Sequence, residues 1–336
     1  MRRLMSFSLI QTFSFLMIAI ASLSACGGGG DSGPGYPDLS YSGIQTEAVI
    51  DQDNADEFTE ASLAGSSSST NVPLFGGVTV EEQSATRVPE PKSLNSLSVL
   101  IANSVMNQMD SGSAELITGV TERINGSCGG SATLTGNDTG SSFTGSMTFS
   151  NFCEPDGLGG TFTMHGKIDF AAEYTGTSES PDISYMSMNI VYLKFIYNDG
   201  TTSWSEELSG AVAVNFDALG EPEGFVITIN FKFNGKIYKI QNLQLDETTG
   251  NIAATLYHPD HGYVDVTTSS PFSYDYVTEQ FCGGTLAITG SNGAGGDSVV
   301  EFTADATCST YDICLTVAPN PQECSLSNPW GAEPVW

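Results

Sequence analysis

Basic residues are scarce in this 336-residue chain. It has 10 Lys and Arg residues against 39 Asp and Glu residues, which gives a formal net charge of −29 at pH 7. A surface this acidic repels nucleic acid and anionic lipid head groups at long range. We therefore expect no nucleic-acid partner, and we interpret the charge mainly as a means of keeping an exported surface soluble.

Catalytic sequence motifs are also missing. The chain has three His residues and no HExxH, phosphate-loop or GxSxG motif. His258, Asp260 and His261 cluster in the sequence His-Pro-Asp-His, but as metal ligands they are weak candidates, because zinc needs three or four ligands and no further one is nearby. Between two strand-like segments, these residues are typical of a tight turn. We expect a turn, no cofactor and no catalytic residue, although the sequence does not exclude an enzyme.

No hydrophobic run is long enough to span a membrane comfortably. The apolar residues at 13–20 fall short of the about 20 that a helical span requires. They follow Arg2 and Arg3 and precede small residues, which is the pattern of a secretory signal. Leu23-Ser24-Ala25-Cys26 resembles the lipobox of bacterial lipoproteins. The resemblance implies cleavage before Cys26, lipid on its thiol and new amino group and, with Gly27 next, an outer-membrane location on a side that the sequence does not define.

Seven Cys residues leave six if Cys26 carries lipid, and an even set in an exported protein favours disulfides. An internal repeat suggests how they pair. Residues 128–153 and 282–308 each contain Cys-Gly-Gly, a Thr-Gly pair at the same offset and a closing Cys. Both copies have a strand, turn, strand pattern, and a hairpin brings its ends within the about 5.5 Å between Cα atoms that a disulfide needs. We predict the bridges Cys128–Cys153, Cys282–Cys308 and, from the remaining pair, Cys314–Cys324.

Two short helices are expected before the β region. Residues 54–63 have a helical pattern after Asp53 or Asn54 as a cap. Apolar residues recur at helical spacing at Leu94, Leu97, Ile101 and Val105, so this stripe should pack on a sheet. The chain divides into a lipoprotein signal peptide (1–25), a flexible tether (26–41), this helical segment (42–112), an antiparallel β domain (113–318) and a disulfide-stapled tail (319–336).

From about residue 113, apolar and polar residues alternate with a period of two. Residues 161–174 and 225–233 show this clearly, and Asn234-Gly235 is a strong hairpin signal. Residues 185–197 are apolar at both alternating positions, which predicts a central strand covered on both faces. We expect an all-β fold, a large antiparallel meander in the form of a curved sheet, an up-and-down barrel or a two-sheet sandwich, with the helical segment packed on it.

These patterns favour an anchored envelope or surface lipoprotein without catalytic activity, which binds an apolar or polymeric ligand or a partner protein. Two alternatives remain: a structural or adhesive surface protein without a small-molecule site, and a polysaccharide hydrolase. An apolar cavity inside the sheet would support the first interpretation. A filled core with exposed aromatic strips would support the second, and a cleft with two facing carboxylates would support the third.

Overall fold

The computed structural model describes residues 35–69, 94–110, 120–155, 160–177, 180–198, 200, 203–216, 222–246, 251–271, 273–275, 280–307, 309–318, 320 and 322–329. The chain separates into two compact units, Met1–Tyr36 and Pro37–Trp336. All the described helices and strands belong to the second unit. The expected signal peptide and Cys26 lie outside the described residues.

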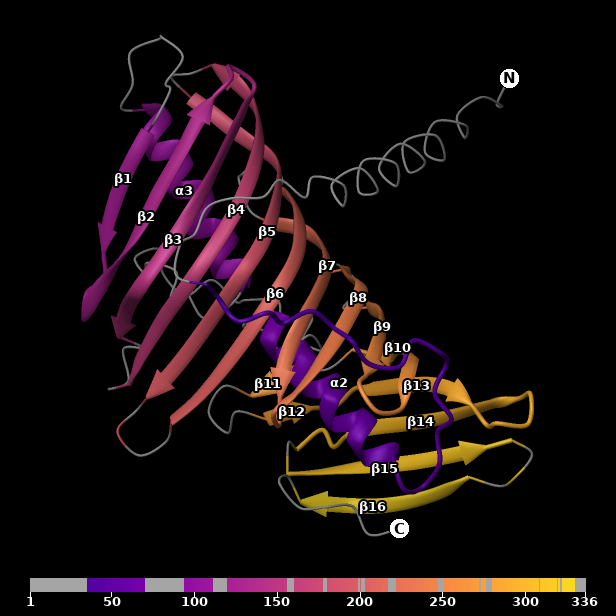
Figure 1. Ribbon diagram of the computed structural model, residues 1–336. Helices are drawn as coiled ribbons and strands as arrows, with labels where there is room; N and C mark the ends of the chain where they lie inside the picture. The colour runs from indigo at the N-terminus through magenta and orange to yellow at the C-terminus, as the bar shows by residue number, and fades with distance from the viewer. Residues whose placement is uncertain are drawn as a thin grey trace, which may run out of the picture. The chain divides into compact units, whose positions relative to one another are not determined.

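One large antiparallel sheet dominates this unit, and among the described residues it has 14 strands (Figure 1). Strands that are adjacent in this sheet are also consecutive in the sequence, except at one place, where the sheet skips a small separate hairpin of β11 (Ser273–Asp275) and β12 (Gln280–Cys282). In order, the strands are β1 (Val120–Asn125), β2 (Gly129–Asp138), β3 (Ser142–Pro155), β4 (Thr161–Thr177), β5 (Ser180–Asn198), β6 (Ser203–Phe216), β7 (Pro222–Phe233), β8 (Lys236–Asp246), β9 (Asn251–His258), β10 (Gly262–Ser270), β13 (Thr285–Ser291), β14 (Asp297–Ala304), β15 (Thr310–Val317) and β16 (Glu323–Pro329). The expected meander is confirmed, and of the three expected forms the sheet takes the open, curved one, with β1 and β16 at its edges.

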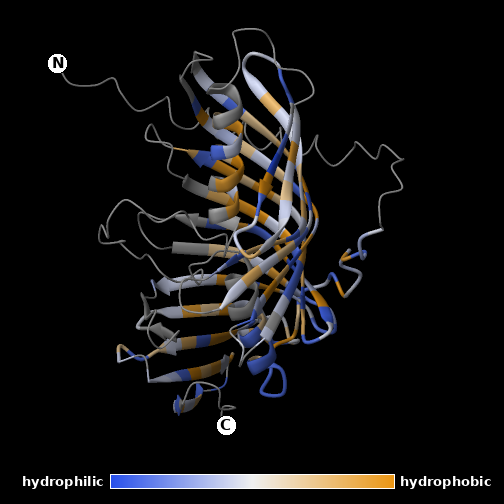
Figure 2. Ribbon diagram, turned by 90° about the vertical axis from the view of Figure 1, so that its left-hand side faces the viewer, coloured by the Kyte–Doolittle hydropathy of each residue, from blue (hydrophilic) through white to orange (hydrophobic). Residues whose placement is uncertain are grey.

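The residues that alternate in the sequence lie on opposite faces of the sheet: the apolar ones on an inner, buried face and the polar ones on an outer, solvent-exposed face. In β4, Met164, Ile168 and Phe170 are buried, while Lys167 and Asp169 between them stay partly exposed. Figure 2 shows the same alternation of apolar and polar residues along the strands. Successive side chains of a strand point to opposite faces, so one face of the sheet is largely apolar and has to be shielded from water.

The interpretation of residues 185–197 as a strand covered on both faces is wrong. Strand β5 pairs with β6 through a register shift between Ile190 and Leu193. Ile190 and Leu193 are both buried, whereas Val191 is 39% exposed. A β-bulge places one extra residue in a strand, so that the apolar positions change parity in the sequence while the buried face stays the same. The apparent second apolar face is mostly the result of this bulge, and Tyr192 beside it, opposite Lys167, is buried as well.

Two helices cover the inner face. Helix α2 (Ala55–Ser69) contacts β7, β8, β9 and β14, and helix α3 (Leu94–Asp110) contacts β5. Leu97, Ile101 and Val105 of the expected stripe are fully buried in one core with the inner face of the sheet. None of the described helices is long and apolar enough to cross a membrane.

The chain just before α2 is tied to two distant strands. Isolated parallel bridges join Glu47 to Tyr263 and Val49 to Ser291. The Ala48 amide donates to the Tyr263 carbonyl at 2.8 Å, and the Ile50 amide donates to the Ser291 carbonyl at 3.0 Å. These bonds fix where α2 begins relative to β10 and β13.

Two of the three expected disulfides are present, Cys128–Cys153 and Cys314–Cys324, with Cα atoms 5.1 and 4.1 Å apart. Cys308 lies outside the described residues, so its bridge to Cys282 stays a prediction. The two Cys-Gly-Gly repeats share a backbone feature, because both glycines of each copy have positive φ. Such angles favour glycine.

Part of the segment 319–336, which the sequence suggested was a tail, belongs to the sheet. Cys324 lies directly opposite Cys314 in the register of β15 and β16. Ser325 and Asn328 are buried and hydrogen-bonded to each other at 2.9 Å. Residues 323–329 are therefore the last strand of the sheet.

Candidate functional site

The sequence His258-Pro259-Asp260-His261 forms the turn between β9 and β10, as its residue types predicted. His258 ends β9, and Gly262 begins β10 with φ +105°. A Cβ atom at Gly262 would collide with the Thr46 carbonyl oxygen, so only glycine permits the close approach of the segment before α2. This tight fit brings the first turn of α2 over the two His side chains.

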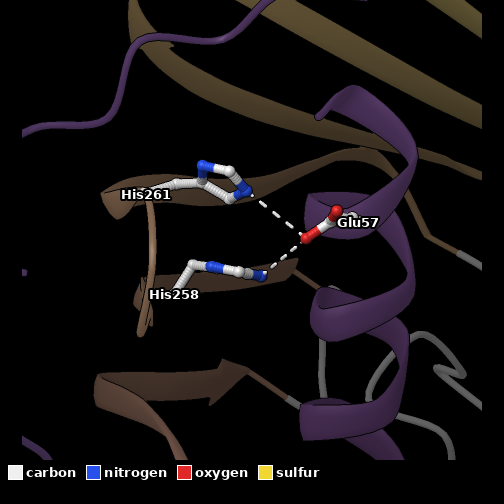
Figure 3. Close-up of side chains that lie close together, drawn as sticks. All are labelled: Glu57, His258 and His261. Carbon is white, nitrogen blue, oxygen red and sulfur yellow. Dashed lines mark hydrogen bonds and ion pairs between the residues drawn. The ribbon is translucent and has the colours of Figure 1, made fainter. Parts of the chain in front are cut away.

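Glu57 of α2 joins the two His residues into one cluster (Figure 3). Its Oε2 atom lies 3.2 Å from Nε2 of His258 and 3.3 Å from Nε2 of His261. One ligand atom of each residue lies within 4.8 Å of the others. We call Glu57, His258 and His261 the Glu–His cluster.

His258 is enclosed by rings. Its ring centroid lies 5.4 Å from that of Phe58, 5.0 Å from that of Tyr238 and 4.4 Å from that of His261. The side chain is fully buried. Burial, with a smaller contribution from the nearby His261, lowers the pKa of His258 to about 4, so the ring is neutral at pH 7.

The hydrogen bonds of His258 define where its single proton sits. The Asp260 backbone amide donates to Nδ1 at 3.2 Å. Because Nδ1 is the acceptor, the neutral ring carries its proton on Nε2, which donates toward Glu57. The Tyr238 hydroxyl also lies 3.4 Å from Nε2.

Asp260, the third weak metal candidate from the sequence, does not join the cluster through its carboxylate. Its Oδ2 atom pairs with the Lys236 ammonium at 2.7 Å, and the hydrogen bond from Lys236 lowers the pKa of Asp260. The carboxylate beside the two His residues is that of Glu57 and not, as the sequence suggested, that of Asp260. No local pattern could have identified Glu57, because only tertiary contacts bring α2 to this turn.

A second feature lies on the outer face, at the other end of the sheet. A shallow depression of about 420 Å³ is lined entirely by polar side chains and glycine: Thr121, Thr135, Gly136, Asn137, Thr144, Gly145, Ser146 and Asp169. Within it, Thr121, Thr135, Ser146 and Asp169 lie directly opposite one another on β1, β2, β3 and β4. The sequence pattern showed that these residues face outward, but not that they line up.

This alignment continues into β5, where Asn189 is the register partner of Asp169. We call Thr121, Thr135, Ser146, Asp169 and Asn189 the polar row. Thr121, Thr135 and Asn189 are exposed, and the hydroxyls of Thr135 and Ser146 are 3.0 Å apart. Asp169 is held by Lys167, whose Nζ lies 3.1 Å from Oδ1.

Comparison with known proteins gives no further assignment: no protein-family model matches the chain, and no curated protein or solved structure matches it either.

Proposed function

We propose that this chain is a lipid-anchored envelope protein without catalytic activity that binds a polar linear polymer along the outer face of its sheet. The polar row is the observation that carries the proposal. It offers hydroxyl, amide and carboxylate groups in direct register across five strands. The lipobox resemblance at Cys26 and the tether 26–41 supply the anchoring part.

The dimensions of the row suit an extended chain. Neighbouring strands lie about 4.8 Å apart, so five strands span about 19 Å. Short side chains keep the surface flat, and the paired glycines Gly136 and Gly145 lie in the depression beneath it. Hydroxyl and amide groups act as both donors and acceptors, which matches a hydroxyl-rich polymer such as a polysaccharide.

An apolar ligand fits this structure less well. The inner face, where Phe143, Met147 and Phe149 lie, forms a single core with side chains of α2 and α3. These apolar residues are buried by the protein itself. We therefore place the ligand on the outer face.

The described lining of the depression does not contain the pair of carboxyl groups that the hydrolase alternative requires. Hydrolysis of a glycosidic bond ordinarily uses two carboxyl groups about 5–10 Å apart. Among the described residues that line the depression, Asp169 alone carries a carboxylate. That carboxylate is paired with Lys167 of the same strand and has no second carboxylate beside it among the described residues that line the depression.

The negative charge of the protein restricts which polymers can bind. The chain has a net charge of −29 and the row contains a carboxylate but no basic residue. Anionic polymers are repelled by such a surface. We propose a neutral polysaccharide.

The test compares two exposed Thr residues on the same face. Thr135 lies in the polar row, and Thr267 is exposed on β10 far along the sheet. Retention of the full chain on a panel of immobilised neutral polysaccharides is measured for the Thr135→Trp and Thr267→Trp variants. We expect Thr135→Trp to lose retention and Thr267→Trp to keep it. Equal retention of both variants, or retention only on anionic polymers, would contradict the proposal.

A further inference from the structure

The geometry points to a site for a divalent transition-metal ion of the zinc class at the Glu–His cluster. Two imidazoles and one carboxylate converge there from segments far apart in the chain. The Glu–His cluster lies on the inner side of the sheet, whereas the polar row lies on its outer face. The two sites are therefore independent.

The distances match those of a shared ion. Zinc binds His nitrogen and carboxylate oxygen at about 2.0–2.2 Å, so two ligands of one tetrahedral ion lie about 3.3 Å apart. Oε2 of Glu57 lies 3.2 and 3.3 Å from the two Nε2 atoms. Only the separation of the two His residues, within 4.8 Å, has to adjust.

The donor set selects the class of ion. Imidazole nitrogen suits zinc, copper, nickel and iron, whereas calcium and magnesium require oxygen ligands. Three protein ligands leave one coordination position for water or another group. The Glu57 side chain is 46% exposed and that of His261 is 30% exposed, so an ion reaches the site from solvent.

Coordination shifts one proton. The metal can bind Nε2 of His258 only after the proton on Nε2 has left, so the neutral ring then carries its one proton on Nδ1. The Asp260 amide, which donates to Nδ1 at 3.2 Å, then loses its acceptor. A metal-bound His ordinarily donates from its other nitrogen, and losing such a partner weakens binding by about 10–100-fold. We therefore expect zinc to bind reversibly and to be removed by a chelator.

The ion would link two parts of the fold. Glu57 belongs to α2, and both His residues belong to the β9–β10 turn. An ion that binds only the folded arrangement raises the melting temperature, and it raises it further as its concentration increases. Zinc would thus add to the hydrogen bonds and apolar contacts that already hold α2 in place.

The test uses Co²⁺ as a spectroscopic substitute for zinc. The full chain is treated with a chelator and titrated with Co²⁺, and the visible absorption of tetrahedral cobalt is recorded, followed by displacement with Zn²⁺. We expect one equivalent to bind. Glu57→Gln and His261→Gln should each lower the Co²⁺ affinity by more than about 100-fold. A loss of that size exceeds the about 10–100-fold loss expected when only a hydrogen-bond partner of a ligand is removed.

Two variants serve as controls. Asp260→Asn changes the carboxylate that pairs with Lys236, and His165→Gln removes the His on β4, so both should retain Co²⁺ binding. Metal-free melting curves that match wild type show that each variant is folded. Absence of cobalt binding by wild type would overturn the proposal, as would unchanged binding in His261→Gln or an equal loss in Asp260→Asn.

Discussion

Oε2 of Glu57 lies 3.3 Å from Nε2 of His261, although 204 positions separate the two residues in the chain. The contact exists because the segment before α2 is hydrogen-bonded to Tyr263 and Ser291. Helix α2 is thereby held over the β9–β10 turn. Helix α2 is consequently part of the core formed with the sheet and not a separate arm.

The first prediction concerns the cover of the inner face. Leu97→Ala removes a fully buried side chain from α3. Such truncations typically lower the free energy of unfolding by about 2–5 kcal/mol. Thermal melting should show a clear decrease, whereas Asn103→Ala, at an exposed position of the same helix, should melt like wild type. Similar melting of both variants would mean that α3 does not pack on the sheet.

The second prediction concerns the disulfides. Peptide mapping without reduction should recover Cys128–Cys153, Cys314–Cys324 and the still untested Cys282–Cys308. Replacing both Cys314 and Cys324 by Ser should lower the free energy of unfolding by about 2–4 kcal/mol, because the cross-link restricts the unfolded chain. A crossed peptide that joins Cys128 to Cys282 would show that the repeat misassigns the pairing.

The third prediction concerns alkaline stability. Burial of Tyr192, together with the charge of Glu207 and their hydrogen bond, raises the Tyr192 pKa to about 12. The unfolded phenol ionises near pH 10, so the stabilisation is complete below pH 10 and disappears as the pH rises toward 12. Stability measured by urea titration should fall less steeply across this range in Tyr192→Phe than in wild type. Identical slopes would show that Tyr192 ionises as freely in the folded state as in the unfolded one.

The fourth prediction concerns the anchor. Cys26→Ser should accumulate as an unlipidated precursor or a mislocalised protein, because the resemblance to a lipobox assigns lipid to this thiol. Detergent partitioning and the mass of the N-terminal peptide measure it. If the wild type partitions into the aqueous phase and its N-terminal peptide carries no acyl mass, the chain is not a lipoprotein.

Local patterns predicted a large part of this fold. The alternation at 161–174 identified the buried face of β4, and the spacing of Leu97, Ile101 and Val105 identified the buried face of α3. Asn234 and Gly235 both adopt positive φ in the hairpin between β7 and β8, as their residue types predict. These features depend on neighbours within a few residues.

Features that depend on distant partners were missed. The bulge after Ile190 arises where β5 pairs with β6, and the sequence of β5 alone reads as apolar on both faces. Glu57 appeared only as an acidic residue in a helical first turn, because its His partners lie in another part of the chain. The polar row likewise requires the register of five strands, which hairpin turn lengths determine jointly.

The most direct test of the central claim is the affinity of the full chain for oligosaccharides of increasing length, cut from a neutral polysaccharide that the protein retains. A row that spans five strands predicts that affinity rises with length until the oligomer covers about 19 Å and then levels off. The oligomers should also be recovered at their original length. Affinity that does not depend on length, or shortened oligomers after incubation, would contradict a non-catalytic polymer-binding row on the outer face of the sheet.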